Sequence, residues 1–172
     1  SVAWNLLGLS VALDRDTPIW LVMKTLVLIY HTQSGNTGQL AKAVERGIAR
    51  EASVMLSVKE AFSAGLEDLL AADAVIFGSP ENFGSMSGAL KDFFDRTYYP
   101  AEHHQLGIPY ALFISAGNDG RGAVREIDRI LKGYPMRKVA EPVIARGEVT
   151  AKDLQACEEL GQAMAAAVAM GV

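Results

Sequence analysis

Residues 25–37, with the sequence TLVLIYHTQSGNT, decide the fold. The run 25–30 is almost continuously apolar, which is typical of a parallel strand covered on both faces. The chain then passes through hydroxyl and amide side chains and a glycine, with no lysine or arginine, before Leu40, Val44 and Ile48 recur at helical spacing. A buried strand that leads through a polar turn into a helix predicts the first strand and first helix of an α/β protein.

The rest of the chain alternates in the same way. Further strands are expected at 53–58, 74–79, 110–117 and, more weakly, 138–145. Further helices are expected at 66–72, 88–98, 124–131 and after residue 150. Thr150 and Asp153 resemble a capping box at the start of the last helix, and Pro142 indicates that the fifth strand is a sheet edge or ends there. Five strands with intervening helices predict one domain, a three-layer α/β sandwich with a five-stranded parallel sheet.

The composition limits the kinds of protein that this chain can be. At 172 residues, with 50% hydrophobic and 21% charged residues, the chain is expected to be globular. A net charge of -4 argues against a nucleic acid partner, for which a basic face is expected. Because Cys157 is the only cysteine, the chain can form neither an internal disulfide nor a thiolate metal cluster. A cytoplasmic location is the default expectation, and no metal site is predicted.

The segment 1–22 differs from the rest of the chain. Asp14, Arg15 and Asp16 interrupt its apolar part well short of the ~18 residues that a membrane-spanning helix needs, and no positive charge precedes it. We expect Met23 to be the natural start, 23–172 to be the domain, and 1–22 to be upstream or appended sequence without an assigned function. An extra element that packs on the domain is the alternative.

Three unusual loops follow the three strongest strands. They are 31–37, 79–87 and 116–122, which contain hydroxyl side chains, amides and glycines. Because ligands bind outside the carboxyl ends of parallel strands, near the point where the strand order reverses, we expect the three loops to form one pocket.

The first loop has the composition of a phosphate-binding site. Thr32, Ser34 and Thr37 offer hydroxyl donors, Gly35 permits a close turn, and the helix that starts near Asn36 offers free N–H groups at its positive end. The loop contains no G-x-x-x-x-G-K-[ST] motif, which argues against hydrolysis of a nucleoside triphosphate. It also contains no G-x-G-x-x-G motif, so it is not a dinucleotide-binding fingerprint. An ordinary turn with a hydroxyl cap is the alternative.

Two motifs resemble those of a known family. The pattern Thr32-x-Ser34-Gly35-Asn36-Thr37 matches the FMN phosphate loop of flavodoxins, [ST]-x-[ST]-G-x-T. The second loop resembles G-[ST]-P-x-x-[FY]-G-x-M of the flavodoxin-like NAD(P)H:quinone oxidoreductases of the WrbA type, and its matching residues are Gly78, Ser79, Pro80, Phe83, Gly84 and Met86. The element order of 23–172 also agrees, whereas the loop 116–122 departs from both patterns. The resemblance implies a flavodoxin-like fold with strand order 2-1-3-4-5.

The resemblance also implies FMN as the cofactor. The candidate FMN-binding residues are Thr32, Gln33, Ser34, Gly35, Asn36, Thr37, Ser79, Pro80, Glu81, Asn82, Phe83, Gly84, Ala116, Gly117, Asn118 and Gly122. Phe83 covers part of the flavin ring in one interpretation and plugs the local core in the other. Arg121 near the ring favours two-electron chemistry, whereas Asp119 there favours one-electron transfer, and the sequence leaves both open. A solvated side chain at the start of a helix is the further alternative for Arg121.

The function expected from the resemblance is an oxidoreductase that passes electrons from NADH or NADPH through FMN to a quinone or similar acceptor, as a homo-oligomer. Its catalysis is centred on the flavin, so no catalytic side chain is assigned. A non-enzymatic electron-transfer flavodoxin that docks to protein partners is the alternative, and a flavodoxin fold without flavin is a third. His103 and His104 are expected on an exposed connection, with a role towards quinone or nicotinamide as the alternative. His31 is expected to pack at a strand end, and Cys157 in the core.

Overall fold

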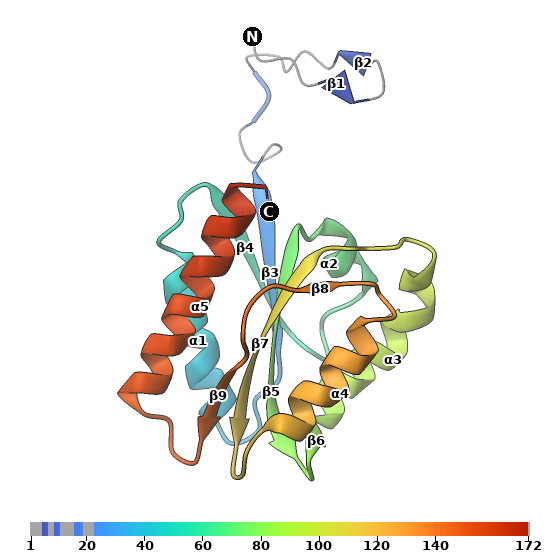
Figure 1. Ribbon diagram of the computed structural model, residues 1–172. Coiled ribbons are helices and arrows are strands. Elements are labelled where there is room, and N and C mark those ends of the chain that lie inside the picture. The colour runs from blue at the N-terminus through green and yellow to red at the C-terminus, as the bar shows by residue number, and fades with distance from the viewer. Residues whose placement is uncertain (1–4, 7–8, 11–15, 19–22, 172) are drawn as a thin grey trace.

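Residues 5–6, 9–10, 16–18 and 23–171 are described by the computed structural model (Figure 1). The strands are β1 (Asn5–Leu6), β2 (Leu9–Ser10), β3 (Lys24–Tyr30), β4 (Val54–Glu60), β5 (Ala74–Asn82), β6 (Ser85–Met86), β7 (Pro109–Ala116), β8 (Arg137–Lys138) and β9 (Val143–Arg146). The helices are α1 (Asn36–Ile48), α2 (Leu66–Ala71), α3 (Gly88–Glu102), α4 (Arg121–Leu131) and α5 (Ala151–Ala169). Most of the segment 1–22, which we expect to be upstream or appended, lies outside the described residues; within it, β1 pairs antiparallel with β2.

The central sheet is parallel. Its strands follow the order β4-β3-β5-β7, and β7 pairs with β8 along its first residues and with β9 along its last. This confirms the predicted order 2-1-3-4-5. The prediction of one continuous fifth strand over 138–145 is wrong, because two short strands, β8 and β9, flank a gap at 139–142. Pro142 lies in this gap and has no N–H to donate to a ladder.

Helices cover both faces of the sheet, with α1 and α5 on one side and α3 and α4 on the other (Figure 1). Alternate side chains of the central strands therefore enter different cores. On β5, Val75 and Phe77 pack in the core that includes α3 and α4, whereas Ala74 and Ile76 pack in the core that includes α1 and α5. Burial on both faces explains why the strong strands are continuously apolar.

Most helix boundaries agree with the predictions. The capping box at the start of α5 is confirmed, since the N–H of Asp153 donates to Thr150 Oγ1 at 3.2 Å and the N–H of Thr150 donates to Asp153 Oδ2 at 2.9 Å. The helix α3 continues past the predicted residue 98 to Glu102, and α4 begins at Arg121 instead of 124. Among the described residues, no helix is long and apolar enough to cross a membrane.

Candidate functional site

The carboxyl ends of β3, β5, β7 and β9 lie at one edge of the sheet, the lower edge in Figure 1. The structure brings the loops 31–37, 79–87 and 116–122 together at this edge. The first two are joined directly, because Asn82 Nδ2 donates to Gln33 Oε1 at 3.1 Å.

The first loop leaves donors free at the start of α1. Gly35 has a φ of 105°, in the left-handed region that favours glycine, and the helix begins at Asn36. Thr32 Oγ1 accepts the N–H of Gly38 at 3.0 Å. Among the described residues, the backbone N–H groups of 33–37 have no protein acceptor. Free N–H groups at the positive end of a helix suit an anion such as a phosphate.

The three hydroxyl side chains of this loop have different roles. Thr37 is buried, and its Oγ1 lies 2.7 Å from Ser115 Oγ, a hydrogen bond that ties α1 to β7. Thr32 caps the first turn of α1. Ser34 is exposed and lines a cavity together with Asn36. Of the three predicted hydroxyl donors, Ser34 is therefore the one that lines the cavity.

The second loop is a hairpin, which corrects the prediction of a loop over 79–87. β5 continues to Asn82 and pairs antiparallel with β6, so that Phe83 and Gly84 form a two-residue turn with φ angles of 52° and 73°. Positive φ at both positions suits the twist of a hairpin. The Phe83 side chain is fully exposed at the tip, so the interpretation that it plugs the local core is wrong. Its contact with a flavin stays a prediction.

The start of α4 packs against the tip of this hairpin. Glu81 Oε2 accepts the N–H of Ala123 at 3.1 Å, and this cap explains why α4 begins earlier than predicted. A Cβ added at Gly122 would lie 1.9 Å from the carbonyl oxygen of Gly84, so only glycine fits there without a shift. The third loop is thereby attached to the second.

Two adjoining cavities lie along this edge. The first has a volume of about 330 Å³, and the predicted residues that line it are Ser34, Asn36, Pro80, Glu81, Asn82, Ala116 and Gly117. The second has a volume of about 390 Å³, and the predicted residues that line it are Glu81, Gly84, Asn118 and Gly122. Because Glu81 lines both, the cavities form one site that extends from the first loop to the start of α4.

The remaining predicted residues support the walls of the site and do not line the cavities. Ser79 is buried, and its Oγ accepts the N–H of Ser87 at 2.9 Å and donates to the carbonyl of Pro80 at 2.8 Å. The others are Thr32, Gln33, Gly35, Thr37 and Phe83, whose contacts or turn conformations are described above.

Sequence reasoning missed Ser115, Gly147 and Glu148, which also line the first cavity. Gly147 and Glu148 follow β9, whose carboxyl end lies at the same edge as the other loops. A fourth loop at this edge could have been predicted, because the expected strand 138–145 ends only one residue before the end of β9 at Arg146.

Charges of both signs line the second cavity. Asp119, Arg121 and Arg125 all line it, and Asp119 Oδ1 accepts the N–H of Arg121 at 3.1 Å. Asp119 and Arg121, the two side chains that the sequence left open as neighbours of the flavin ring, therefore line the same cavity.

The histidines and the cysteine lie away from these cavities. His31 packs at the strand end, as predicted, with Nδ1 3.5 Å from Glu60 Oε2. His103 and His104 are exposed at the end of α3, as predicted. Cys157 is buried in the core, as predicted, and burial raises the pKa of its thiol to about 12. Among the described residues, no group of three or more His, Cys, Asp and Glu side chains could hold a metal ion.

A family model matches more than half of the chain. The model described as NADPH-dependent FMN reductase matches residues 23–151.

Curated relatives match over shorter stretches. The chain is 37% identical over 100 residues to an NAD(P)H dehydrogenase (quinone) of Archaeoglobus fulgidus, which covers 44% of this chain and 52% of that protein. It is 37% identical over 73 residues to a flavodoxin of Aquifex aeolicus, which covers 42% of this chain and 40% of that protein. The chain thus spans about half the length of the curated relatives it matches.

Solved structures match over most of the chain. A flavodoxin from the domain Archaea superposes with a TM-score of 0.73 at 27% identity, covering 84% of this chain and 98% of that one. A WrbA-like flavodoxin from Agrobacterium tumefaciens superposes with a TM-score of 0.71 at 21% identity, covering 87% and 99%, which supports the fold alone.

Proposed function

Because the chain belongs to the NADPH-dependent FMN reductase family, we propose that it is an FMN-containing oxidoreductase that passes electrons from NAD(P)H to a quinone or similar small acceptor. The cofactor is FMN, and when bound it supplies the hydride and electron-transfer chemistry. The observation that carries the proposal is the free N–H cradle of 33–37 at the mouth of the first cavity.

The first loop fits the phosphate of FMN. The N–H groups of 33–37 have no protein acceptor among the described residues, and the dipole of α1 adds partial positive charge. Ser34 and Asn36 line the cavity and can add hydrogen bonds to phosphate oxygens. A basic side chain is not needed there, because neutral donors at a helix terminus suffice for anion binding.

The hairpin and the third loop fit the ring of FMN. In the proposal, Pro80, Glu81 and Asn82 form one wall of the ring site, and 116–118 form the other. Glu81 attaches the first wall to the start of α4, which follows the second wall in the chain, through its hydrogen bond from the N–H of Ala123. In the proposal, the exposed ring of Phe83, at the tip of the hairpin, covers part of the flavin or a substrate.

Charges of both signs line the site, so it has basic groups of the kind expected of an enzyme as well as carboxylates. The two cavities are lined by the carboxylates of Glu81, Asp119 and Glu148 and by the guanidinium groups of Arg121 and Arg125. Basic groups near the flavin stabilise its reduced, anionic form and thus favour two-electron chemistry, whereas an acidic surround favours one-electron carriers. The similarity to an archaeal flavodoxin keeps a carrier that docks to protein partners as the second candidate.

Anaerobic addition of NADPH, and separately of NADH, to the FMN-loaded protein distinguishes the two candidates. The proposed enzyme bleaches the flavin absorbance rapidly with at least one of them, and added quinone restores it. Stable bound flavin that neither nucleotide reduces would contradict the enzyme and favour the carrier. Homo-oligomer formation and a cytoplasmic location remain predictions, which light scattering and cell fractionation test.

A further inference from the structure

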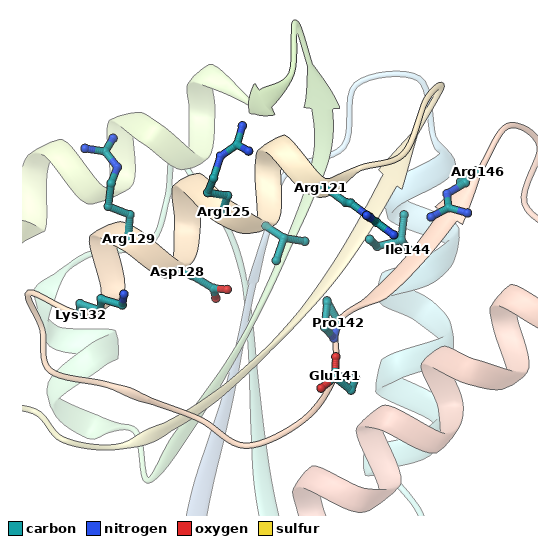
Figure 2. A pocket seen from close by; sticks show the side chains of 10 residues that line it. Arg121, Arg125, Asp128, Arg129, Lys132, Glu141, Pro142, Ile144 and Arg146 are labelled. Carbon is teal, nitrogen blue, oxygen red and sulfur yellow. The ribbon is translucent and has the colours of Figure 1, made fainter.

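A larger cavity lies beside the FMN site, between α4 and the segment 141–146 (Figure 2). We call it the basic groove. Its volume is about 700 Å³, within the range of roughly 300–1,000 Å³ that is usual for small-molecule sites. Val124, Pro142 and Ile144 contribute apolar surface to its lining.

The basic groove is positively charged although the chain is acidic. Five basic side chains and two carboxylates line it, a net charge of +3, whereas the whole chain has a net charge of -4. One of the carboxylates, Asp128, is already held by Lys138 Nζ at 2.8 Å and by the hydroxyl of Tyr110 at 2.7 Å. The excess positive charge of the groove therefore favours the binding of an anion from outside the chain.

Helix α4 concentrates this charge on one face. Arg121, Arg125 and Arg129 follow one another at intervals of four residues, a spacing at which like charges repel. Among the described residues, Arg129 is the one of the three with a carboxylate partner, Glu126 at 2.9 Å. A bound anion would relieve the repulsion between the other two.

The basic groove is continuous with the FMN site. Arg121 and Arg125 line both the groove and the second cavity of the FMN site. On the opposite wall, Arg146 lines the groove and directly precedes Gly147 and Glu148, which line the first cavity. Figure 2 shows Arg121 and Arg146 extending from the two walls towards Ile144. A ligand with one end at the flavin and an anionic remainder in the groove would pass beside these two arginines.

We infer that the basic groove binds the adenosine phosphates of the dinucleotide hydride donor, with Arg121 and Arg146 as anion-binding residues; this rests on the proposed function. Guanidinium groups bind phosphate oxygens through paired, charge-assisted hydrogen bonds. The apolar lining offers a surface for the adenine. Because the extra phosphate of NADPH adds negative charge at this end, the groove favours NADPH over NADH.

Calorimetric titration of the FMN-loaded protein with adenosine 2′,5′-bisphosphate tests the inference without measuring activity. The wild type is expected to bind this fragment, and more weakly at high salt. The variant Arg121→Gln/Arg146→Gln is expected to bind it about tenfold more weakly or worse, because charge-assisted hydrogen bonds are lost. Glu141→Gln removes a carboxylate from the same groove and is expected to tighten binding, a gain that misfolding cannot produce.

The charge-matched control is Lys24→Gln/Arg50→Gln. It removes two positive charges at the opposite edge of the sheet, where Lys24 pairs with Asp73 and Arg50 with Glu158, and it should leave the affinity unchanged.

Equal affinities of the wild type and the double arginine variant would overturn the inference. Equal affinities for inorganic phosphate and the bisphosphate would also overturn it, in favour of unspecific anion attraction. If the wild type binds FMN and is reduced by NADPH but does not bind the bisphosphate, the groove assignment alone fails. If FMN is not bound, or NADPH does not reduce it, the proposed function fails.

Discussion

Replacing Gly122 by alanine is expected to move the hairpin away from α4 and weaken FMN binding. The added Cβ would lie 1.9 Å from the carbonyl oxygen of Gly84, whereas real Cβ contacts stay beyond 3.0 Å, so the two must separate by at least about 1.1 Å. The same movement would strain the 3.1 Å hydrogen bond between Glu81 Oε2 and the N–H of Ala123.

The expected magnitude follows from these contacts. Overpacking costs about 1–3 kcal/mol, and the higher helix propensity of alanine returns up to about 1 kcal/mol. We therefore expect the free energy of unfolding of the apo-protein to fall by about 1–2 kcal/mol. Because FMN needs the hairpin in its original place, the same strain opposes binding. At about 1.4 kcal/mol per factor of ten, a strain of about 1–2 kcal/mol raises the Kd about five- to thirtyfold.

Two assays measure these effects, namely quenching of flavin fluorescence for the Kd and urea unfolding of the apo-protein for stability. Gly88→Ala is the matched control, because Gly88 also opens a helix and an added Cβ there would meet no atom within 4 Å. If Gly122→Ala bound FMN as tightly as Gly88→Ala and the wild type, the hairpin would not be a wall of the FMN site.

Three further changes have defined outcomes. Gly161→Ala should lower the free energy of unfolding in urea by about 1–3 kcal/mol, because the added Cβ would lie 2.2 Å from the carbonyl oxygen of Val44 where α1 meets α5. Ser79→Ala should cost about 1–3 kcal/mol and speed hydrogen exchange at Ser87, whose N–H loses its acceptor. The pKa of the Cys157 thiol rises from 9.0 to about 12 on folding, so the unfolded chain loses this proton at lower pH than the folded protein. The contribution of the buried thiol to the free energy of unfolding is therefore complete below pH 9.0 and is lost as the pH rises towards 12. Urea unfolding across this pH range should therefore show a steeper loss of stability for the wild type than for Cys157→Ala.

The positions of the strands and of the site were predictable because they depend on local patterns, whereas the strand order was implied by the resemblance to flavodoxins. The runs of β3, β5 and β7 are buried on both faces, and such runs are continuously apolar in the sequence. The fifth strand was not predictable in detail, because Pro142 divides it into β8 and β9, and the pairing of each piece with β7 depends on distant residues.

The roles of individual side chains depend on contacts that the sequence does not contain. Thr37 and Ser34 are both hydroxyl residues of one motif, yet a partner 78 positions away, Ser115, draws the hydroxyl of Thr37 into the core. The hairpin turn was concealed because it places Phe83 at positive φ, a conformation more usual for glycine or asparagine.

Titration of the apo-protein with FMN and with riboflavin, followed by flavin fluorescence, tests the central claim most directly. Riboflavin has the ring of FMN and lacks the phosphate, so the difference in affinity measures the contribution of the first loop. We predict that the wild type binds FMN much more tightly than riboflavin, and that Ser34→Ala/Asn36→Ala reduces this difference. Equal affinity of the wild type for the two ligands would contradict the assignment of 32–37 as the phosphate-binding loop.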